Sequence, residues 1–262
     1  MKKLLIFNWK MAPQSLSEAK RLLTSNLQPT TNNKNVEVIV CPPFIYLSGL
    51  SSVVGRRSSV KLGAQDVFYK NQGVYTGEIS AKMLKNLGVE YVIIGHSERR
   101  KYLNETDEMI NKKVLVGLKA GLKVILCVGE PTRGRKYKAE SIKRAKNYVK
   151  KQLEKDLKGI LSLVVGRKSL VGNLAIAYEP VWAIGGNHSD TPQDALEMIK
   201  YIKQVLSIKY QALGIRALYG GSVSSKNIGD FLKHPEIDGA LVGHASLKPK
   251  EVETIIKTVG KL

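Results

Sequence analysis

Short apolar runs alternate with longer amphipathic stretches from one end of the chain to the other. Most of these runs are apolar on both faces, which is typical of strands in a parallel sheet that helices cover on each side. The pattern predicts eight strands: Leu4–Asn8, Glu37–Cys41, Val60–Ala64, Tyr91–Gly95, Lys123–Val128, Leu174–Tyr178, Ala217–Tyr219 and Gly239–Val242.

Eight strands that alternate with helices predict an α/β fold, and a single closed (β/α)8 barrel uses this length well. We see no linker and no low-complexity segment, so residues 1–262 are expected to form one catalytic domain. A doubly wound open sheet is the alternative architecture, but no Gly-x-Gly-x-x-Gly turn follows the first strand.

Several helix ends are marked in the sequence. Thr106 can cap a helix that runs to Gly121, and Thr191-Pro192 offers a cap and a first-turn proline to another helix. Gly88 and Gly214 follow helical patterns at the position where a left-handed residue commonly ends a helix.

The composition supports a folded protein inside the cell. The chain is 43% hydrophobic, which provides a sizeable core and argues against disorder. No apolar run approaches the roughly 20 residues that span a bilayer, and Asn8 interrupts the apolar start too early for a signal peptide. Cys41 and Cys127 each end an apolar run, so we expect buried thiols, no disulfide, no metal site and a cytoplasmic location.

The charge is less ordinary, with a formal net charge of +20. Residues 133–168 alone contain 13 Lys or Arg against three acidic residues. Within this stretch apolar residues recur every three or four positions, which predicts an amphipathic helix with a basic solvent face: Ile142, Ala145, Val149, Leu153, Leu157 and Ile160. A surface for nucleic acid or an anionic membrane is the alternative, although few aromatic residues are interleaved with the lysines.

In a barrel, catalytic groups are expected where strands end at the carboxyl face. The predicted strand ends bring together Lys10, His96 and Glu179, with small-residue turns at Gly220-Gly221 and Val242-Gly243. A carboxylate can act as a base, an imidazole can polarise a carbonyl, and an ammonium can stabilise a developing oxyanion. Glycine-rich turns let backbone N–H groups approach a phosphate. This set suits proton abstraction next to a carbonyl.

Several longer motifs surround these residues along the chain: Asn8-Trp9-Lys10-Met11, Gly63-Ala64-Gln65, Tyr75-Thr76-Gly77-Glu78-Ile79-Ser80, Gly95-His96-Ser97-Glu98-Arg99-Arg100, Cys127-Val128-Gly129-Glu130, Tyr178-Glu179-Pro180-Val181-Trp182-Ala183-Ile184-Gly185 and Tyr219-Gly220-Gly221-Ser222-Val223. These motifs resemble the signature segments of the triosephosphate isomerase family, in the same order and over nearly the whole chain.

The resemblance implies a cofactor-free isomerase of triose phosphates. By similarity, Glu179 moves a proton between the two carbons of an enediol, and His96 polarises the carbonyl as a neutral imidazole. A helix start at Ser97 would disfavour the imidazolium form of its neighbour. Lys10 would balance the charge of the enediolate and phosphate, with Asn8 supporting the substrate oxygens and Glu98 positioning nearby groups.

The resemblance also implies how phosphate is held and how two chains meet. The segment after strand six resembles the closing lid of the family, with Pro180-Val181-Trp182 as its first hinge and the Gly185 N–H as a phosphate donor. Ser222, Gly243 and the N–H of His244 would complete the phosphate site. Residues 73–78 resemble the loop that places Thr76 at the site of a second subunit, which implies a homodimer.

Four features depart from the family pattern, and none removes a catalytic group. Ala12 stands where Asn is usual, His244 stands where Gly is usual, residues 186–189 differ from the usual second hinge, and the stretch from Glu130 to Leu174 is longer and more basic. Two other functions stay open: a phosphosugar barrel of another activity, which would not be expected to retain Lys10, His96 and Glu179 together, and a barrel that binds a polyanion through residues 133–168.

Overall fold

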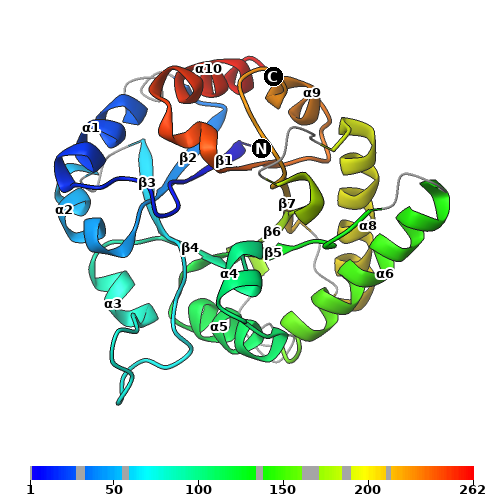
Figure 1. Cartoon of the computed structure of the whole chain (residues 1–262), viewed down its shortest axis with the longest axis horizontal. Coiled ribbons are helices and arrows are strands. Elements are labelled where there is room, and N and C mark those ends of the chain that lie inside the picture. The colour runs from blue at the N-terminus through cyan, green and yellow to red at the C-terminus, as the bar shows by residue number, and fades with distance from the viewer. Residues whose placement is uncertain are drawn as a thin grey trace.

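The computed structural model describes residues 2–27, 33–54, 59–133, 138–160, 171–184, 190–210 and 214–262. Eight parallel strands close into a barrel in chain order, and helices surround it (Figure 1). The α/β prediction and the closed (β/α)8 topology are therefore confirmed, and the open doubly wound sheet is excluded. The strands are β1 Lys3–Asn8, β2 Val36–Cys41, β3 Val60–Ala64, β4 Tyr91–Ile94, β5 Lys123–Val128, β6 Leu174–Tyr178, β7 Arg216–Tyr219 and β8 Gly239–Val242.

The strand limits agree with the sequence to within one residue at each end. The clearest difference is at β4, which ends at Ile94, because Gly95 has a φ of 73° and turns the chain out of the sheet. The helices are α1 Leu16–Leu27, α2 Phe44–Val54, α3 Ala81–Asn86, α4 Ser97–Tyr102, α5 Asp107–Lys119, α6 Lys138–Asp156, α8 Pro192–Tyr210, α9 Ile228–Leu232 and α10 Pro249–Gly260.

The predicted helix ends are confirmed in their chemistry. The Thr106 hydroxyl accepts a hydrogen bond from the Met109 N–H at the start of α5, although the helix ends at Lys119, before Gly121. Thr191 caps α8 in the same way, through the N–H of Asp194. Gly88 and Gly214 have φ values of 80° and 87°, the left-handed conformation expected of helix ends.

Alternation along each strand produces two apolar layers. In β1, Leu4 and Ile6 pack with the barrel interior, while Leu5 and Phe7 pack with the helices outside. The interior also holds Cys41 and Cys127, and both thiols are free and buried as expected. Burial raises the pKa of both thiols.

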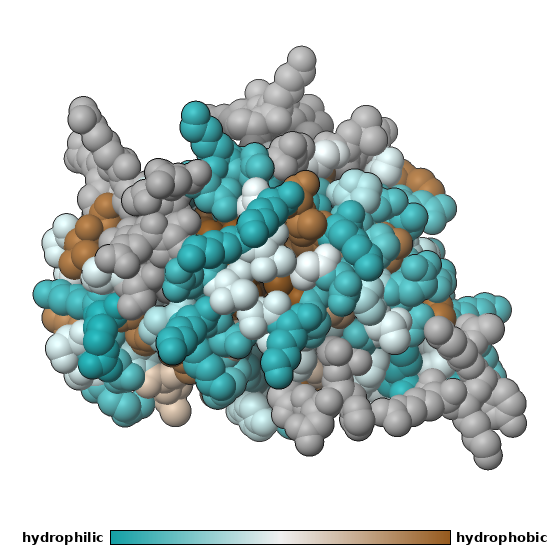
Figure 2. Space-filling view, turned by 90° about the horizontal axis from the view of Figure 1, so that it is seen from above, coloured by the Kyte–Doolittle hydropathy of each residue, from teal (hydrophilic) through white to brown (hydrophobic). Residues whose placement is uncertain are grey.

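The described part of the basic stretch contains the expected amphipathic helix, α6, although the helix ends at Asp156, before Leu157 and Ile160. Within α6, Ala145, Val149 and Leu153 are buried, and Ile142 is half-buried. The helix lies at the outer rim of the barrel (Figure 1). The face over α10, seen from above Figure 1, is likewise mostly hydrophilic with scattered apolar residues (Figure 2). Among the described residues, no helix is long and apolar enough to cross a membrane.

Candidate active site

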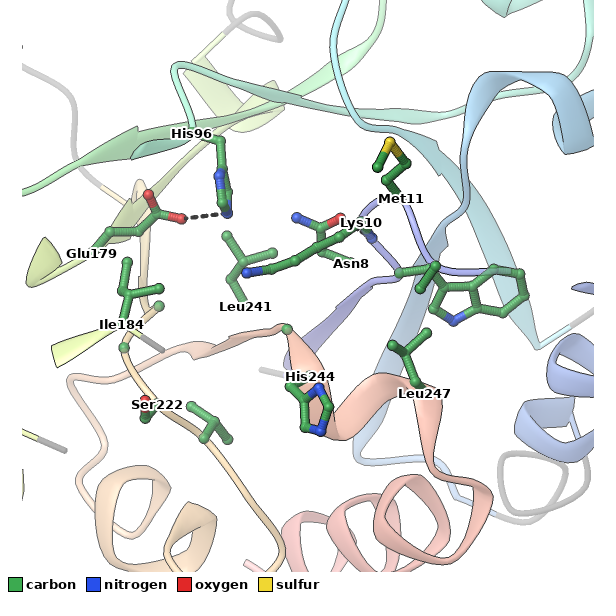
Figure 3. A pocket seen from close by; sticks show the side chains of 16 residues that line it. Asn8, Lys10, Met11, His96, Glu179, Ile184, Ser222, Leu241, His244 and Leu247 are labelled. Atoms are coloured by element: carbon green, nitrogen blue, oxygen red, sulfur yellow. Dashed lines mark hydrogen bonds and ion pairs between the residues drawn. The ribbon is translucent and has the colours of Figure 1, made fainter. Parts of the chain in front are cut away.

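A cavity of about 610 Å³ opens where the strands end at the carboxyl face of the barrel. It brings together most of the predicted site residues from β1, β4, β6, β7 and β8 (Figure 3). The lining residues are Asn8, Trp9, Lys10, Met11, Ala12, His96, Glu179, Ile184, Gly220, Gly221, Ser222, Val223, Leu241, Gly243, His244 and Leu247.

Glu179 follows β6 directly, and its side chain is 2% exposed. Its Oε2 accepts a hydrogen bond of 2.9 Å from the Ser97 N–H, and its Oε1 lies 3.2 Å from His96 Nε2. Oε1 has no hydrogen-bond partner among the described residues. The absence of a side chain at Gly220 leaves room for the carboxylate, because a Cβ there would lie 2.9 Å from Glu179 Cγ. A backbone donor therefore holds one carboxylate oxygen, and the other lies beside His96.

His96 caps the N-terminus of α4, and this fixes which ring nitrogen carries hydrogen. Its Nδ1 accepts a hydrogen bond of 3.2 Å from the Glu98 N–H. In a neutral ring the other nitrogen, Nε2, is therefore the donor. The Nε2 edge faces the cavity beside Glu179 (Figure 3), where it can donate to a substrate oxygen.

Lys10 is held in an unusual backbone conformation just after β1. Its φ of 53° is in the left-handed region, which is uncommon for a residue with a side chain. Two hydrogen bonds support it, from the Lys10 N–H to Asn8 Oδ1 at 3.0 Å and from Gln65 Nε2 to the Lys10 carbonyl at 2.9 Å. The Lys10 ammonium forms an ion pair with Glu98 and extends across the cavity (Figure 3). The conformation therefore delivers a cation to the site.

The β7 and β8 ends form the opposite wall. Ser222 Oγ donates to the Ala183 carbonyl at 2.7 Å, which joins this wall to the segment after β6. Gly243 packs against Lys10, since a Cβ there would lie 3.2 Å from Lys10 Cε. His244 begins a short 3₁₀ helix, His244–Leu247, and its side chain is exposed. Its backbone is not in the left-handed region, so replacing the usual Gly causes no strain of that kind.

Comparison with known proteins is consistent with this geometry. The triosephosphate isomerase family matches residues 3–259. The triosephosphate isomerase of Dictyoglomus thermophilum is 41% identical over 260 residues, covering 98% of this chain and 99% of that protein. That of Caldanaerobacter subterraneus subsp. tengcongensis is 44% identical over 254 residues, covering 95% and 96%, respectively.

The chain belongs to the triosephosphate isomerase family.

Two of the predicted site residues, Glu98 and Thr76, do not line the cavity. Glu98 contacts the site only through its ion pair with Lys10. Thr76 lies on the exposed segment that projects from the barrel between β3 and α3 (Figure 1). Gly185, and with it the altered second hinge at 186–189, lies outside the described residues.

Sequence reasoning did not assign roles to several residues that support the family's site. Gln65 also donates to the Cys41 carbonyl at 2.9 Å, so it ties β1 to β2 beneath Lys10. Arg133 contacts both the loop after β5 and the start of α8. Gln65 stood in a family motif and could have been noticed there, whereas Arg133 carries no local signal. The described residues contain no group of His, Cys, Asp or Glu side chains suited to a metal ion.

Proposed function

We propose that the described cavity carries out the isomerisation of its family, the interconversion of dihydroxyacetone phosphate and D-glyceraldehyde 3-phosphate through an enediol or enediolate. This reaction belongs to glycolysis and gluconeogenesis. The observation that carries the proposal is the meeting of the Glu179 carboxylate, the Nε2 edge of His96 and the Lys10 ammonium at one cavity. These are a base, a neutral hydrogen-bond donor and a cation, the parts that proton transfer next to a carbonyl needs.

Glu179 is the proposed base. It takes a proton from the carbon next to the carbonyl, the C–H electrons form the C=C bond of the enediolate, and the carbonyl oxygen gains the negative charge. His96 Nε2 donates a hydrogen bond to that oxygen. The hydroxyl group on the deprotonated carbon then gives its O–H proton to that oxygen and becomes the new carbonyl. At the same time the C=C electrons take the proton back from Glu179 at the former carbonyl carbon, which gives the isomer. The Ser97 N–H now holds the carboxylate, so Glu179 must exchange this hydrogen bond for the substrate.

Lys10 and Asn8 are the proposed electrostatic partners of the reacting oxygens. Glu98 shares the Lys10 ammonium before substrate binds, which keeps the cation oriented in the cavity. For the phosphate, we propose the Ser222 hydroxyl and the N–H groups of Gly243 and His244, with Gly185 added on the family resemblance alone. The small residues at these turns allow close approach to the phosphate oxygens.

A homodimer is the proposed assembly, with Thr76 reaching the partner's site. Apolar side chains are exposed after four neighbouring strands, β1 to β4, which supports a covered surface there. They are Met11, Ile45, Val74, Tyr75, Tyr102 and Leu103. A mass near twice 29.0 kDa by light scattering is the expected result, and a monomer would contradict it.

We further propose that residues 1–262 act as one catalytic domain, without a metal or organic cofactor, in the cytoplasm. Every proposed catalytic group is a side chain or a backbone donor of this chain. The two free, buried thiols fit a reducing compartment.

A coupled assay on the purified protein tests the function in both directions. We expect turnover of dihydroxyacetone phosphate and glyceraldehyde 3-phosphate, unchanged after exhaustive chelation. No turnover with either substrate would contradict the isomerase, and loss on chelation that one metal restores would contradict cofactor-free catalysis. A filter-binding assay with nucleic acid, run beside it, tests the polyanion alternative.

A further inference from the structure

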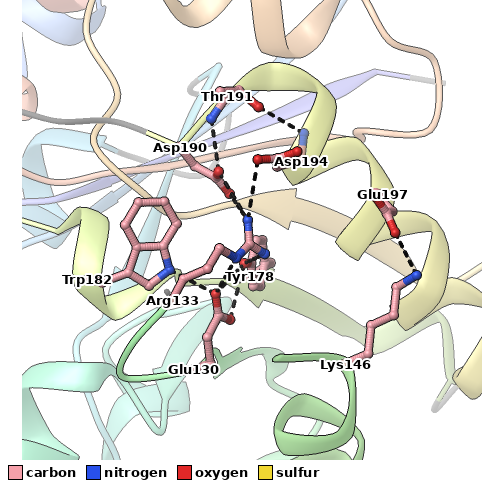
Figure 4. Close-up of polar contacts among 9 residues, drawn as sticks. All are labelled: Glu130, Arg133, Lys146, Tyr178, Trp182, Asp190, Thr191, Asp194 and Glu197. Carbon is pink, nitrogen blue, oxygen red and sulfur yellow. Dashed lines mark hydrogen bonds and ion pairs between the residues drawn. The ribbon is translucent and has the colours of Figure 1, made fainter. Parts of the chain in front are cut away.

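One guanidinium group contacts residues on both sides of the segment 185–189. Arg133 lies in the loop between β5 and α6, and its side chain is 8% exposed. Its Nη1 lies 3.3 Å from Asp190 Oδ1 and 3.8 Å from Asp194 Oδ2 on the α8 side. Its Nη2 donates to the Tyr178 hydroxyl at 3.1 Å on the β6 side (Figure 4).

The same group reaches the residues just after β6. Arg133 Nε lies 3.3 Å from Glu130 Oε1, and that oxygen accepts a hydrogen bond of 2.8 Å from Trp182 Nε1. The guanidinium also lies over the indole ring, 5.4 Å from its centroid. Arg133 and Glu130 together therefore fix Trp182 (Figure 4).

Trp182 is directly followed by residues that touch the cavity. The Ala183 carbonyl accepts the hydrogen bond of Ser222 Oγ, and Ile184 lines the cavity itself. A shift of Trp182 would therefore move this wall and the hydroxyl opposite it. Without the guanidinium, the buried carboxylates of Glu130 and Asp190 would lose the cation that they share, and buried like charges repel strongly.

We propose that Arg133 is a positioning residue, which joins Asp190 to Glu130 and Trp182 and so holds the wall of the cavity formed by Ile184 and Ser222. Arg133 does not line the cavity and takes no part in proton transfer. We expect the loss of Arg133 to weaken substrate binding more than it slows catalysis. Through Trp182, Arg133 orders the Ile184 and Ser222 wall of the cavity and not the proposed base, Glu179.

The kinetic test is Arg133→Met, which keeps much of the side-chain length and removes the charge and the donors. KM should rise about tenfold or more, and kcat should fall less than about threefold. The inhibition constant of inorganic phosphate should rise in parallel with KM. Arg133→Lys keeps the charge but not the planar set of donors, so its KM should lie between those of wild type and Arg133→Met.

Lys146→Met is the matched control. Lys146 pairs with Glu197 at 2.7 Å and so joins α6 to α8, and its replacement removes the same charge (Figure 4). Its partners Glu197 and Tyr201 both lie on α8, away from Glu130 and Trp182. It should leave KM within twofold of wild type. If Arg133→Met matches this control, or lowers kcat with KM unchanged, the proposal is wrong.

A second test reads Trp182 directly and does not need catalysis. The chain has two tryptophans, Trp9 and Trp182, so 5-fluorotryptophan labelling gives two ¹⁹F resonances, which Trp182→Phe assigns. Asp190→Asn keeps the shape of the side chain and removes its charge. It should shift the Trp182 resonance and leave that of Trp9 in place. An unmoved Trp182 resonance would overturn the proposal even if Arg133→Met failed to fold.

The charge state of Asp190 adds a pH signature. Burial raises the pKa of Asp190 to about 6, against the lowering effect of Arg133. The other groups that face it are Glu130, Asp194, Tyr178 and Tyr219. The wild-type Trp182 resonance should therefore titrate with a midpoint near pH 6, and Asp190→Asn should remove that transition. A transition that persists in Asp190→Asn would assign the titration to another group and contradict the link.

The kinetic test rests on the proposed function, and the two can fail separately. An inactive wild-type protein would contradict the proposed isomerase activity. If the wild type is active, but Arg133→Met leaves KM unchanged and Asp190→Asn leaves the Trp182 resonance unchanged, only the role of Arg133 is contradicted.

Discussion

The carboxylate of Glu179 is the side chain on which the proposed proton transfer depends, and its surroundings are nearly closed to solvent. Glu179→Gln should lower kcat by about 10²–10⁴-fold, because an amide cannot accept the proton. The amide oxygen can still accept the Ser97 N–H, so the fold and the phosphate side of the site should persist. The measurement is kcat by coupled assay, with phosphate inhibition as the control for an intact site. Retention of more than about a tenth of wild-type kcat would mean that another group is the base.

His244 is the residue at the cavity that differs most from the family pattern. Its backbone N–H, the proposed phosphate donor, does not depend on the side chain, and its backbone is not left-handed. His244→Gly should therefore change KM by less than about threefold at pH 8, with kcat unchanged. Steady-state kinetics of both proteins at equal ionic strength test this. A tenfold rise in KM would assign the exposed imidazole a direct contact with substrate.

At this scale the sequence predicted which residues meet but not how they are held. Strand ends placed Lys10, His96 and Glu179 at one face, because parallel strands present the same end together. The Ser97 N–H bound to Glu179, and the left-handed backbone of Lys10, depend on three-dimensional contacts across 82 and 55 residues of chain. No local pattern encodes such contacts.

Among the elements, α6 carries the densest run of exposed basic residues, and most of its partners are on other helices. Lys146 pairs with Glu197 on α8, and Arg144 pairs with Glu140 within α6. The predicted apolar stripe fixed the buried face of this helix correctly, because helical periodicity alone determines which side faces the sheet. The network around Arg133 was not predictable in this way, since its partners Tyr178 and Asp190 lie 45 and 57 residues away.

Neutralising the exposed face of α6 should have little effect on substrate capture. The Debye length at 0.15 M salt is about 8 Å, so charges at the outer rim are largely screened from the barrel mouth. Replacing Lys143, Arg144, Lys146 and Lys150 by Gln should change kcat/KM by less than about threefold at that salt concentration. Far-ultraviolet circular dichroism checks that the helix persists. A larger loss in a folded variant would tie this face directly to substrate capture.

For the molecule as a whole, closing the barrel requires that its amino-terminal end also be joined. Glu37 on β2 does this with side chains from four other strands. Its carboxylate accepts a hydrogen bond of 2.6 Å from the Tyr91 hydroxyl on β4, and it pairs with Lys61 on β3, Lys123 on β5 and Arg216 on β7. The apolar pattern predicted the strands that carry these groups, but not that side chains from four strands would share the carboxylate of a fifth.

The Glu37 cluster makes the stability of the barrel depend on pH in a defined window. Partial burial alone would raise the pKa of Glu37, but the hydrogen bonds from Tyr91 and Lys61 and the charges of Lys61 and Lys123 lower it to about 2. A carboxyl group with a pKa lower in the folded than in the unfolded chain stabilises the fold above the unfolded value of 4.5. That contribution, on the order of 3 kcal/mol, is lost as the pH falls from about 4.5 toward 2.

Glu37→Gln should therefore lower the free energy of unfolding at pH 7, and the difference from wild type should shrink below pH 4.5. Urea unfolding at pH 7, 5.5, 4.5 and 3.5 measures this difference. The protein concentration is kept equal, because the stability of the proposed dimer would depend on it. Glu90→Gln is the matched control: Glu90 shares Lys61 and Lys123, but its side chain is 42% exposed, so its loss should cost less than half as much. A Glu37 deficit of equal size at pH 3.5 and pH 7 would mean that shape, and not the buried charge, makes this residue important to the barrel.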